Sequence, residues 1–322
     1  MKEEDQLGGP ARRERAISTA VDAVFALLIL GIAVGLLTMG VSYGQTQDSD
    51  RESTRADHTA ETLLSSTVTT EYSIQPVSTE PEFEAGNVGS ETAYTRVVHG
   101  TPADLLADAA VTNARFDEPS LWDNTGQLTV TGQSYEDALA ESVYVRMLPA
   151  ESKFNMTAVW RPYENSSVLG TASAGDSPPS NKEVHSVTTT VPSGIEPVEP
   201  DASRDFDAWG DAIARSIVDG YFPERASNLS LEQRGLEREL TVYRYKRIET
   251  FLENDVDLGD RTTNGGPLNR STANSAEAND RLVDALGDRI ATELANEYDD
   301  PSDVEAGVQA SEVEITVRVW DE

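Results

Sequence analysis

The sequence predicts an α+β fold, with an N-terminal transmembrane helix followed by an extracellular α+β domain that has antiparallel hairpins and a helical C-terminal lobe. Three observations lead to this prediction. The apolar run from Ala23 to Val41 is long enough to span a bilayer, because a crossing helix needs about 20 residues. Segments rich in β-branched residues, separated by turn residues, follow as far as residue 199. Residues 200–322 then carry three helical apolar stripes and a closing strand, and strands followed by helices are typical of α+β domains.

The 322-residue chain is strongly acidic, with 57 Asp and Glu residues against 25 Lys and Arg residues and a net charge of −32. In dilute salt such a charge opposes a compact state, whereas molar salt shortens the Debye length to about 3 Å. Dispersed acids and scarce lysine are typical of proteins from extreme halophiles. The charge disfavours nucleic acid as a partner, because no basic patch is available for phosphates. The absence of cysteine rules out disulfides, thiolate metal sites and cysteine nucleophiles.

The first predicted segments are a cytoplasmic tail or prepeptide over residues 1–16 and a transmembrane helix over residues 17–44. Between Ala16 and Gly44 the only charged residue is Asp22. A cleaved secretory signal has a shorter apolar region, of about 7–15 residues, and a small-residue cleavage site that this run lacks. Arginines precede the run and acids follow it, so the positive-inside rule places the N-terminus in the cytoplasm. We therefore expect a single-pass protein of the cell membrane whose C-terminal domain is extracellular and which contacts membrane lipid.

The residues in front of the run carry a more specific signal. Arg15 and Ala16 form a basic-small pair, and Ile17 opens the apolar stretch. This sequence segment resembles the class III signal of archaeal type IV pilins. The resemblance implies that a prepilin peptidase cuts between Ala16 and Ile17, and that the apolar helix is kept as the core of a filament.

Asp22 and two glycines are the candidate assembly residues of this helix. Asp22 follows Ile17 by five residues, roughly 7–8 Å along a helix, so it sits near the cytoplasmic interface. Inserting a carboxylate at the bilayer centre costs about 2.5–3.5 kcal/mol, and the cost is lower near the interface. Asp22 is either an interfacial acid or the partner of the freed α-amine of Ile17 on a neighbouring subunit. Gly31 and Gly35 form a G-x-x-x-G pair that lets helices approach closely.

The next elements are a stalk helix over residues 45–66 and a strand-rich lobe over residues 67–199. Residues 67–74 and 91–100 are β-branched and predict two strands. Thr101 as N-cap, followed by proline and an early acid, predicts the start of a helix. A second helix is expected after Ser134, which forms a capping box with Asp137.

A long hairpin is expected at the end of this lobe. The strands 153–164 and 183–194 alternate or are rich in Val and Thr, and the Gly/Ser/Pro-rich residues 165–181 read as the loop between them. The helical lobe, residues 200–322, begins with apolar stripes over 205–222, 231–252 and 275–298. It ends in an alternating strand over 311–320.

Little in this domain indicates chemistry. The three histidines have no metal-ligand spacing, and the acidic clusters do not match a calcium loop. We therefore expect that the protein is not an enzyme and that it has no catalytic residues, no cofactor and no metal. Four N-x-S/T sequons are candidate N-glycosylation sites, with Asn165 in the hairpin loop as the most plausible: Asn155, Asn165, Asn228 and Asn269.

The hairpin segment "AVWRPYE" and "GDSPPSNKEVHSVTTTVPSG" also resembles haloarchaeal single-pass proteins associated with pilus machinery. The two resemblances together imply a pilin-like or pseudopilin-like accessory subunit of an archaeal type IV pilus or secretion-type filament. Its partners would be other pilin-like subunits or a membrane platform protein. The alternative is a non-polymerising, surface-anchored binding or structural protein of the haloarchaeal cell envelope.

Overall fold

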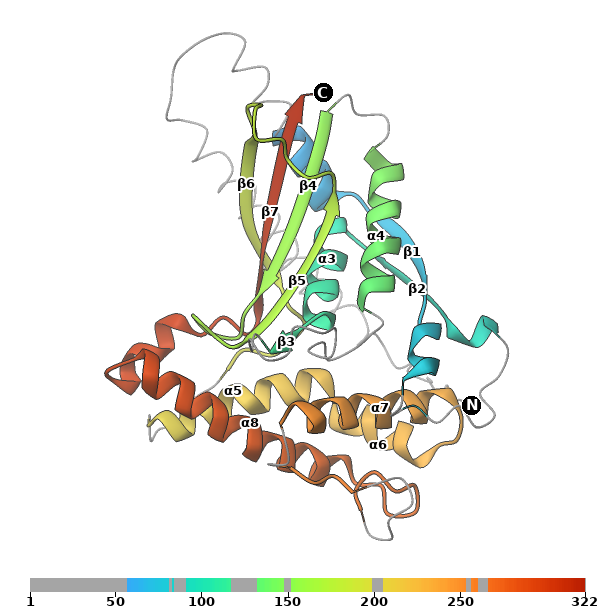
Figure 1. The fold of residues 1–322 in the computed structure, drawn as a ribbon, viewed down its shortest axis with the longest axis vertical. Coiled ribbons are helices and arrows are strands. Elements are labelled where there is room, and N and C mark those ends of the chain that lie inside the picture. Colours follow the sequence, from blue (N-terminus) through green and yellow to red (C-terminus); the bar gives the residue numbers. More distant parts are fainter. Residues whose placement is uncertain are drawn as a thin grey trace, which may run out of the picture. The chain divides into compact units, whose positions relative to one another are not determined.

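The computed structural model describes residues 57–80, 83, 91–116, 132–147, 152–198, 205–252, 256–259 and 266–321. Residues 53–322 form one compact unit. Its described part is α+β with antiparallel sheets, which confirms this part of the predicted fold class (Figure 1). The predicted tail and transmembrane helix, residues 1–44, lie outside the described residues. None of the helices in the described ranges combines the length and apolarity that a bilayer crossing requires.

A five-stranded antiparallel sheet has the strand order β3-β5-β4-β7-β6. Its strands are β3 (Arg115–Phe116), β4 (Ser152–Trp160), β5 (Val168–Gly175), β6 (His185–Pro192) and β7 (Glu312–Asp321). The C-terminal strand β7 lies between β4 and β6, and its alternating residues Val313, Ile315, Val317 and Val319 are buried as the sequence pattern predicts. One face of the sheet therefore belongs to the core.

The expected long hairpin is wrong in its pairing. The strands β4 and β6 both exist, but β7 separates them, and residues 165–181 contain the strand β5 instead of being a loop. The sequence pattern did not predict β5 because this strand is rich in small residues, whereas strands are usually recognised by β-branched and aromatic side chains. Gly170 has a packing role: a Cβ atom there would lie 2.2 Å from the carbonyl oxygen of Ala110 on α3.

The two strands predicted first are present as β1 (Val68–Ser73) and β2 (Thr95–Gly100), and they pair in a two-stranded antiparallel sheet. The helix α3 (Pro102–Thr112) contacts β4, β5, β6 and β7, and α4 (Gly132–Met147) contacts β1 and β5 (Figure 1). Thr101 caps α3 as expected, since its side-chain oxygen accepts a hydrogen bond from the backbone N–H of Asp104 at 3.1 Å. The capping box at Ser134 is wrong, because Ser134 lies inside α4.

The C-terminal helices are α5 (Phe206–Tyr221), α6 (Glu224–Glu232), α7 (Leu236–Phe251) and α8 (Ser275–Glu297). The single helix expected over 231–252 is divided, because Gly235 takes the left-handed φ of 101° that ends such a run. The helices α5 and α8 lie side by side. A Cβ atom on Gly210 would lie 2.4 Å from the carbonyl oxygen of Gly287, so the two backbones approach closely. Three 3-10 helices complete the described elements: η1 (Gln75–Thr79), η2 (Glu91–Tyr94) and η4 (Pro301–Gly307).

One main hydrophobic core joins the sheet to the helices. It also takes in the described end of the predicted stalk, where residues 57–65 are helical and Ala60 and Leu63 are 2% and 0% exposed. The expected boundary between the two lobes, at residues 199 and 200, falls within the same compact unit. The described end of the stalk, residues 57–65, is thus part of the same folded unit as the sheet and the C-terminal helices.

Candidate functional site

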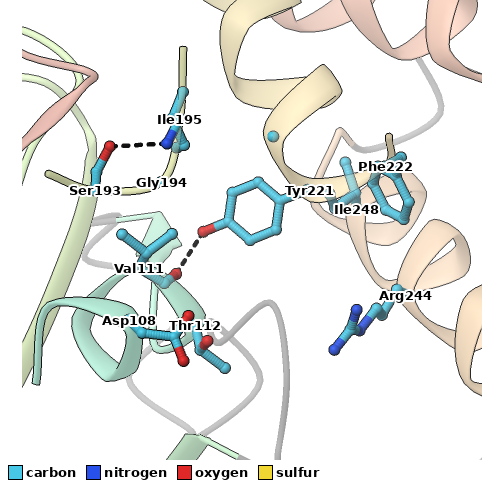
Figure 2. A pocket seen from close by; sticks show the side chains of 11 residues that line it. Asp108, Val111, Thr112, Ser193, Gly194, Ile195, Tyr221, Phe222, Arg244 and Ile248 are labelled. Carbon is cyan, nitrogen blue, oxygen red and sulfur yellow. Dashed lines mark hydrogen bonds between the residues drawn. The ribbon is translucent and has the colours of Figure 1, made fainter. Parts of the chain in front are cut away.

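A pocket of about 230 Å³ opens where α3, α5, α7 and the turn after β6 meet (Figure 2). Its walls combine aliphatic and aromatic side chains with one acid and one arginine. The lining residues are Asp108, Val111, Thr112, Ser193, Gly194, Ile195, Gly220, Tyr221, Phe222, Arg244 and Ile248. This partly open pocket brings unlike charges to one apolar-walled cavity, which makes it our candidate site within the described residues.

Backbone contacts hold the walls in place. The Tyr221 hydroxyl at the end of α5 donates a hydrogen bond to the carbonyl oxygen of Val111 on α3. After β6, the Ser193 hydroxyl donates to the carbonyl oxygen of Ala310 at 2.7 Å and accepts from the N–H of Ile195 at 3.1 Å. The first bond joins α5 to α3, and the other two fix the turn after β6 against the residues that precede β7, so packed elements form these walls of the pocket.

Asp108 and Arg244 lie on different walls of the pocket (Figure 2). Asp108 and Thr112 are one turn apart on α3 and therefore share a face of that helix. Arg244 extends from α7 on the other side, beyond the ring of Tyr221. Both charged side chains keep contact with solvent. In the part of the chain that the structure describes, no ion pair within 4 Å joins Asp108 to Arg244.

The surroundings of Asp108 disfavour its charged form. Removal of water around the carboxyl raises the pKa of Asp108, although a hydrogen bond with Tyr135 and the nearby charge of Arg244 both act in the opposite direction. Burial, followed by the charge of Asp108, raises the pKa of Tyr135, so that phenol stays protonated and able to donate. Tyr72 stacks on Tyr135 with ring centroids 4.7 Å apart. A cationic group close to Asp108 would therefore stabilise the charged form of its carboxyl.

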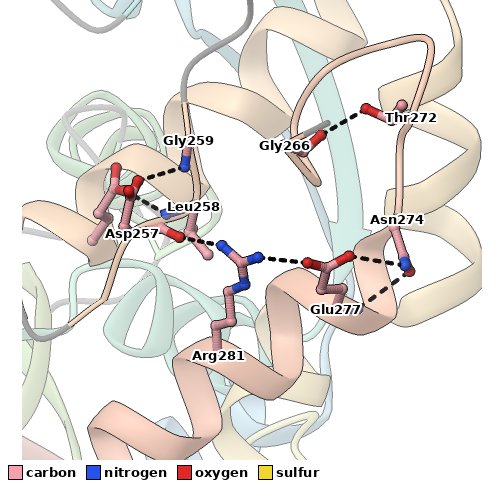
Figure 3. A network of polar contacts seen from close by, with 9 residues as sticks. Asp257, Leu258, Gly259, Gly266, Thr272, Asn274, Glu277 and Arg281 are labelled. Carbon is pink, nitrogen blue, oxygen red and sulfur yellow. Dashed lines mark hydrogen bonds and ion pairs between the residues drawn. The ribbon is translucent and has the colours of Figure 1, made fainter. Parts of the chain in front are cut away.

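A second, more open hollow of about 880 Å³ lies along α8 and contains acids and arginines together. Its two arginines already have partners: Arg281 donates to Glu277 at 2.5 Å and to the carbonyl oxygen of Asp257 (Figure 3), and Arg289 donates to Glu293 at 3.3 Å. Asn274 caps α8 by accepting from the N–H of Glu277. This network fixes a loop to a helix. Across the residues with assigned positions, no three His, Cys, Asp or Glu side chains are arranged to hold a metal ion.

The predicted processing and assembly residues lie outside the described residues: Arg15, Ala16, Ile17, Asp22, Gly31 and Gly35. Their roles therefore remain predictions. The expectation that catalytic residues, cofactors and metals are absent also remains a prediction.

The four sequons occupy different environments. Asn155 lies in β4 with 8% of its surface exposed, and its Oδ1 accepts from Arg318 at 3.3 Å, which argues against a glycan on the folded chain. Asn165 is exposed in the β4–β5 turn with φ 58°, and its Nδ2 donates to Glu297 at 2.7 Å. Asn228 and Asn269 are half-buried. Asn165 is the most exposed of the four sequons, and its glycosylation remains a prediction.

Sequence reasoning did not find the pocket. Its lining residues come from α3, the turn after β6, α5 and α7, which are widely separated in the chain. Asp108 lies in an alanine-rich helix and Arg244 in a helix with several arginines, so neither stands out locally. Only the packing of these segments brings the two charges to one cavity.

Comparison with known proteins gives a family but no characterised relative. No curated protein and no solved structure matches the chain. The model of a family of unknown function, DUF7284, matches residues 21–320. The matched range includes Asp22 and the whole apolar run from Ala23 to Val41, and it covers the described elements except for the last residue of β7. Since this match covers most of its length, the chain belongs to the DUF7284 family.

Proposed function

We propose that the chain is a pilin-like or pseudopilin-like accessory subunit of an archaeal type IV pilus or secretion-type filament. One N-terminal helix over residues 17–44 anchors it in the cell membrane, with the N-terminus in the cytoplasm and the α+β unit outside. The observation that carries the proposal is the basic-small pair of Arg15 and Ala16 directly before an apolar run that is long enough to span the bilayer.

The start of the folded unit fits an anchored head. Residues 57–65 are helical, and the apolar side chains of Ala60, Leu63 and Leu64 pack into the main core. β1 follows directly at Val68. The described part of the chain nearest the proposed anchor is therefore packed into the core.

The proposed partners follow from the predicted helix. Membrane lipid surrounds residues 17–44, and a prepilin peptidase frees the α-amine of Ile17. That amine pairs with Asp22 of a neighbouring subunit during assembly, while Gly31 and Gly35 allow close contact with other pilin-like subunits or a membrane platform protein.

A second candidate function is a surface-anchored protein that binds a ligand and does not polymerise. The pocket with Asp108 and Arg244 favours it, because filament packing does not need a charged cavity in the folded unit. Both candidates share the membrane anchor and differ in assembly.

Filament purification separates the two functions. We expect sheared surface filaments from native cells to contain the chain. Replacing Asp22 with alanine should lower its amount in the filaments severalfold while the amount in membranes stays unchanged, because only the assembly contact is lost. Asp48→Asn, an acid beyond the run, is the control and should assemble normally. Filaments without the wild-type chain, with the chain intact in the membrane, would favour the non-polymerising protein.

A further inference from the structure

The pocket beside α3 presents two unlike charges to one small cavity. The carboxylate of Asp108 and the guanidinium of Arg244 line the same volume of about 230 Å³ from different helices. The side chains of Ile195, Tyr221 and Ile248 supply an apolar surface between them. This arrangement suits a small ligand that carries a cationic group, an anionic group and an apolar group.

We propose that this pocket binds a small zwitterion of the α-amino acid class with an apolar side chain. The ammonium group lies toward Asp108, where the hydroxyl of Thr112 is one helical turn away on the same wall. The carboxylate lies toward Arg244, whose planar fork suits bidentate binding of a carboxylate. The ligand side chain packs against the ring of Tyr221 and the aliphatic residues.

Other ligand classes fit less well. A simple cation that bound to Asp108 would be repelled by Arg244, which would have no anionic partner. A simple anion that bound to Arg244 would be repelled by the carboxylate of Asp108. Nucleotides and drug-sized molecules occupy pockets of about 300–1,000 Å³, which is larger than this cavity. A free amino acid satisfies both charges and the size together.

The hydrogen-bonding state of the walls supports the same orientation. The hydroxyls of Ser193 and Tyr221 are already engaged with backbone groups, so they shape the pocket and leave recognition to the charged residues. Bringing an ammonium group to Asp108 offsets the unfavourable removal of water from its carboxyl. This inference is independent of whether the chain is anchored or polymerises.

Isothermal titration calorimetry of the full-length chain tests the proposal. The probes are L-leucine, L-valine and L-phenylalanine, each added alone. Two fragments of leucine, 3-methylbutylamine and 4-methylpentanoate, each carry one of its two charges. The variant Asp108→Asn removes one charge with little change in volume, and Arg244→Gln removes the other charge and shortens the side chain. The matched controls are Asp280→Asn and Arg215→Gln, which remove the two charges of an exposed ion pair (3.5 Å) outside the pocket.

We expect at least one of the three amino acids to bind saturably to the wild-type chain and to both controls. Each pocket variant should weaken that binding about tenfold or more, because a hydrogen bond to a charged group is worth roughly that factor. Each fragment should bind more weakly than leucine. Thermal unfolding of every variant checks that it is folded. The proposal is overturned if none of the amino acids binds the wild type, if either pocket variant binds like the controls, or if a fragment binds as tightly as leucine.

Discussion

Replacing Gly170 with alanine tests the close approach of α3 to β5. A Cβ atom at this position would lie 2.2 Å from the carbonyl oxygen of Ala110 and 2.9 Å from its carbonyl carbon. Ordinary contact begins near 3.4 Å, so the backbone of α3 would have to withdraw by about 1.2 Å. The neighbour is backbone and not the end of a flexible side chain, and α3 also contacts β4, β6 and β7, which resist that movement.

The expected sign distinguishes the strand from a loop. Alanine in place of glycine in a regular strand normally stabilises a protein by about 0.5–1 kcal/mol. Overpacking a core costs about 1–3 kcal/mol, and a backbone clash belongs at the upper end of that range. The net expectation is a loss of about 1–2 kcal/mol in the free energy of unfolding. If residues 165–181 formed the loop that the sequence suggests, Gly170→Ala would be neutral or stabilising.

Urea unfolding at high salt, followed by far-ultraviolet circular dichroism, measures the effect. The matched control is Thr171→Ala, because Thr171 is the next residue, is exposed, and contributes its backbone carbonyl to the bond with Asn113. It should change stability by less than about 0.5 kcal/mol. A Gly170→Ala protein as stable as the wild type would refute the packing of α3 on β5.

Three further predictions concern the core, a tie between elements and the pocket. Leu63→Ala should lower the free energy of unfolding by about 2–5 kcal/mol, since Leu63 is 0% exposed, and a cost below 1 kcal/mol would show that residues 57–65 are not part of the core. Tyr163→Phe removes the hydroxyl that donates to Glu293 at 2.5 Å and should cost about 1–2 kcal/mol by urea unfolding; no loss would mean that this bond does not hold the β4–β5 turn to α8. Burial raises the pKa of Asp108, so the folded chain holds this proton more tightly than the unfolded chain, and its contribution to stability falls as the pH rises through that range. Asp108→Asn should therefore melt at a higher temperature than wild type at neutral pH, with the difference shrinking as the pH falls below the raised pKa; a difference that is constant with pH would contradict this.

Local chemistry made several elements predictable from the sequence. Thr101 and Pro102 start α3 because an N-cap oxygen and a proline without an N–H both suit the first turn. β7 was recognised because Val313, Ile315 and their neighbours alternate with polar residues, and a strand with one buried face requires that period. In each case the signal lies within a few consecutive residues.

The pairing of strands was not predictable in the same way. The alternation of β4 and β6 does not reveal that β7 enters between them, because the partner comes from more than a hundred residues away. The sequence did not predict β5 because glycine and alanine have low strand propensity, and Gly170 is required for close packing against α3. The pocket was missed for a related reason: Asp108 and Arg244 become a site only after distant helices pack.

The state of the bond between Ala16 and Ile17 tests the proposed function most directly. Mass spectrometry of the N-terminal peptide, from chain purified out of native membranes, measures it. We expect a mature N-terminus at Ile17 in wild-type cells and an uncut bond in cells without the prepilin peptidase. An uncut Ala16–Ile17 bond in wild-type cells would contradict the pilin-like function.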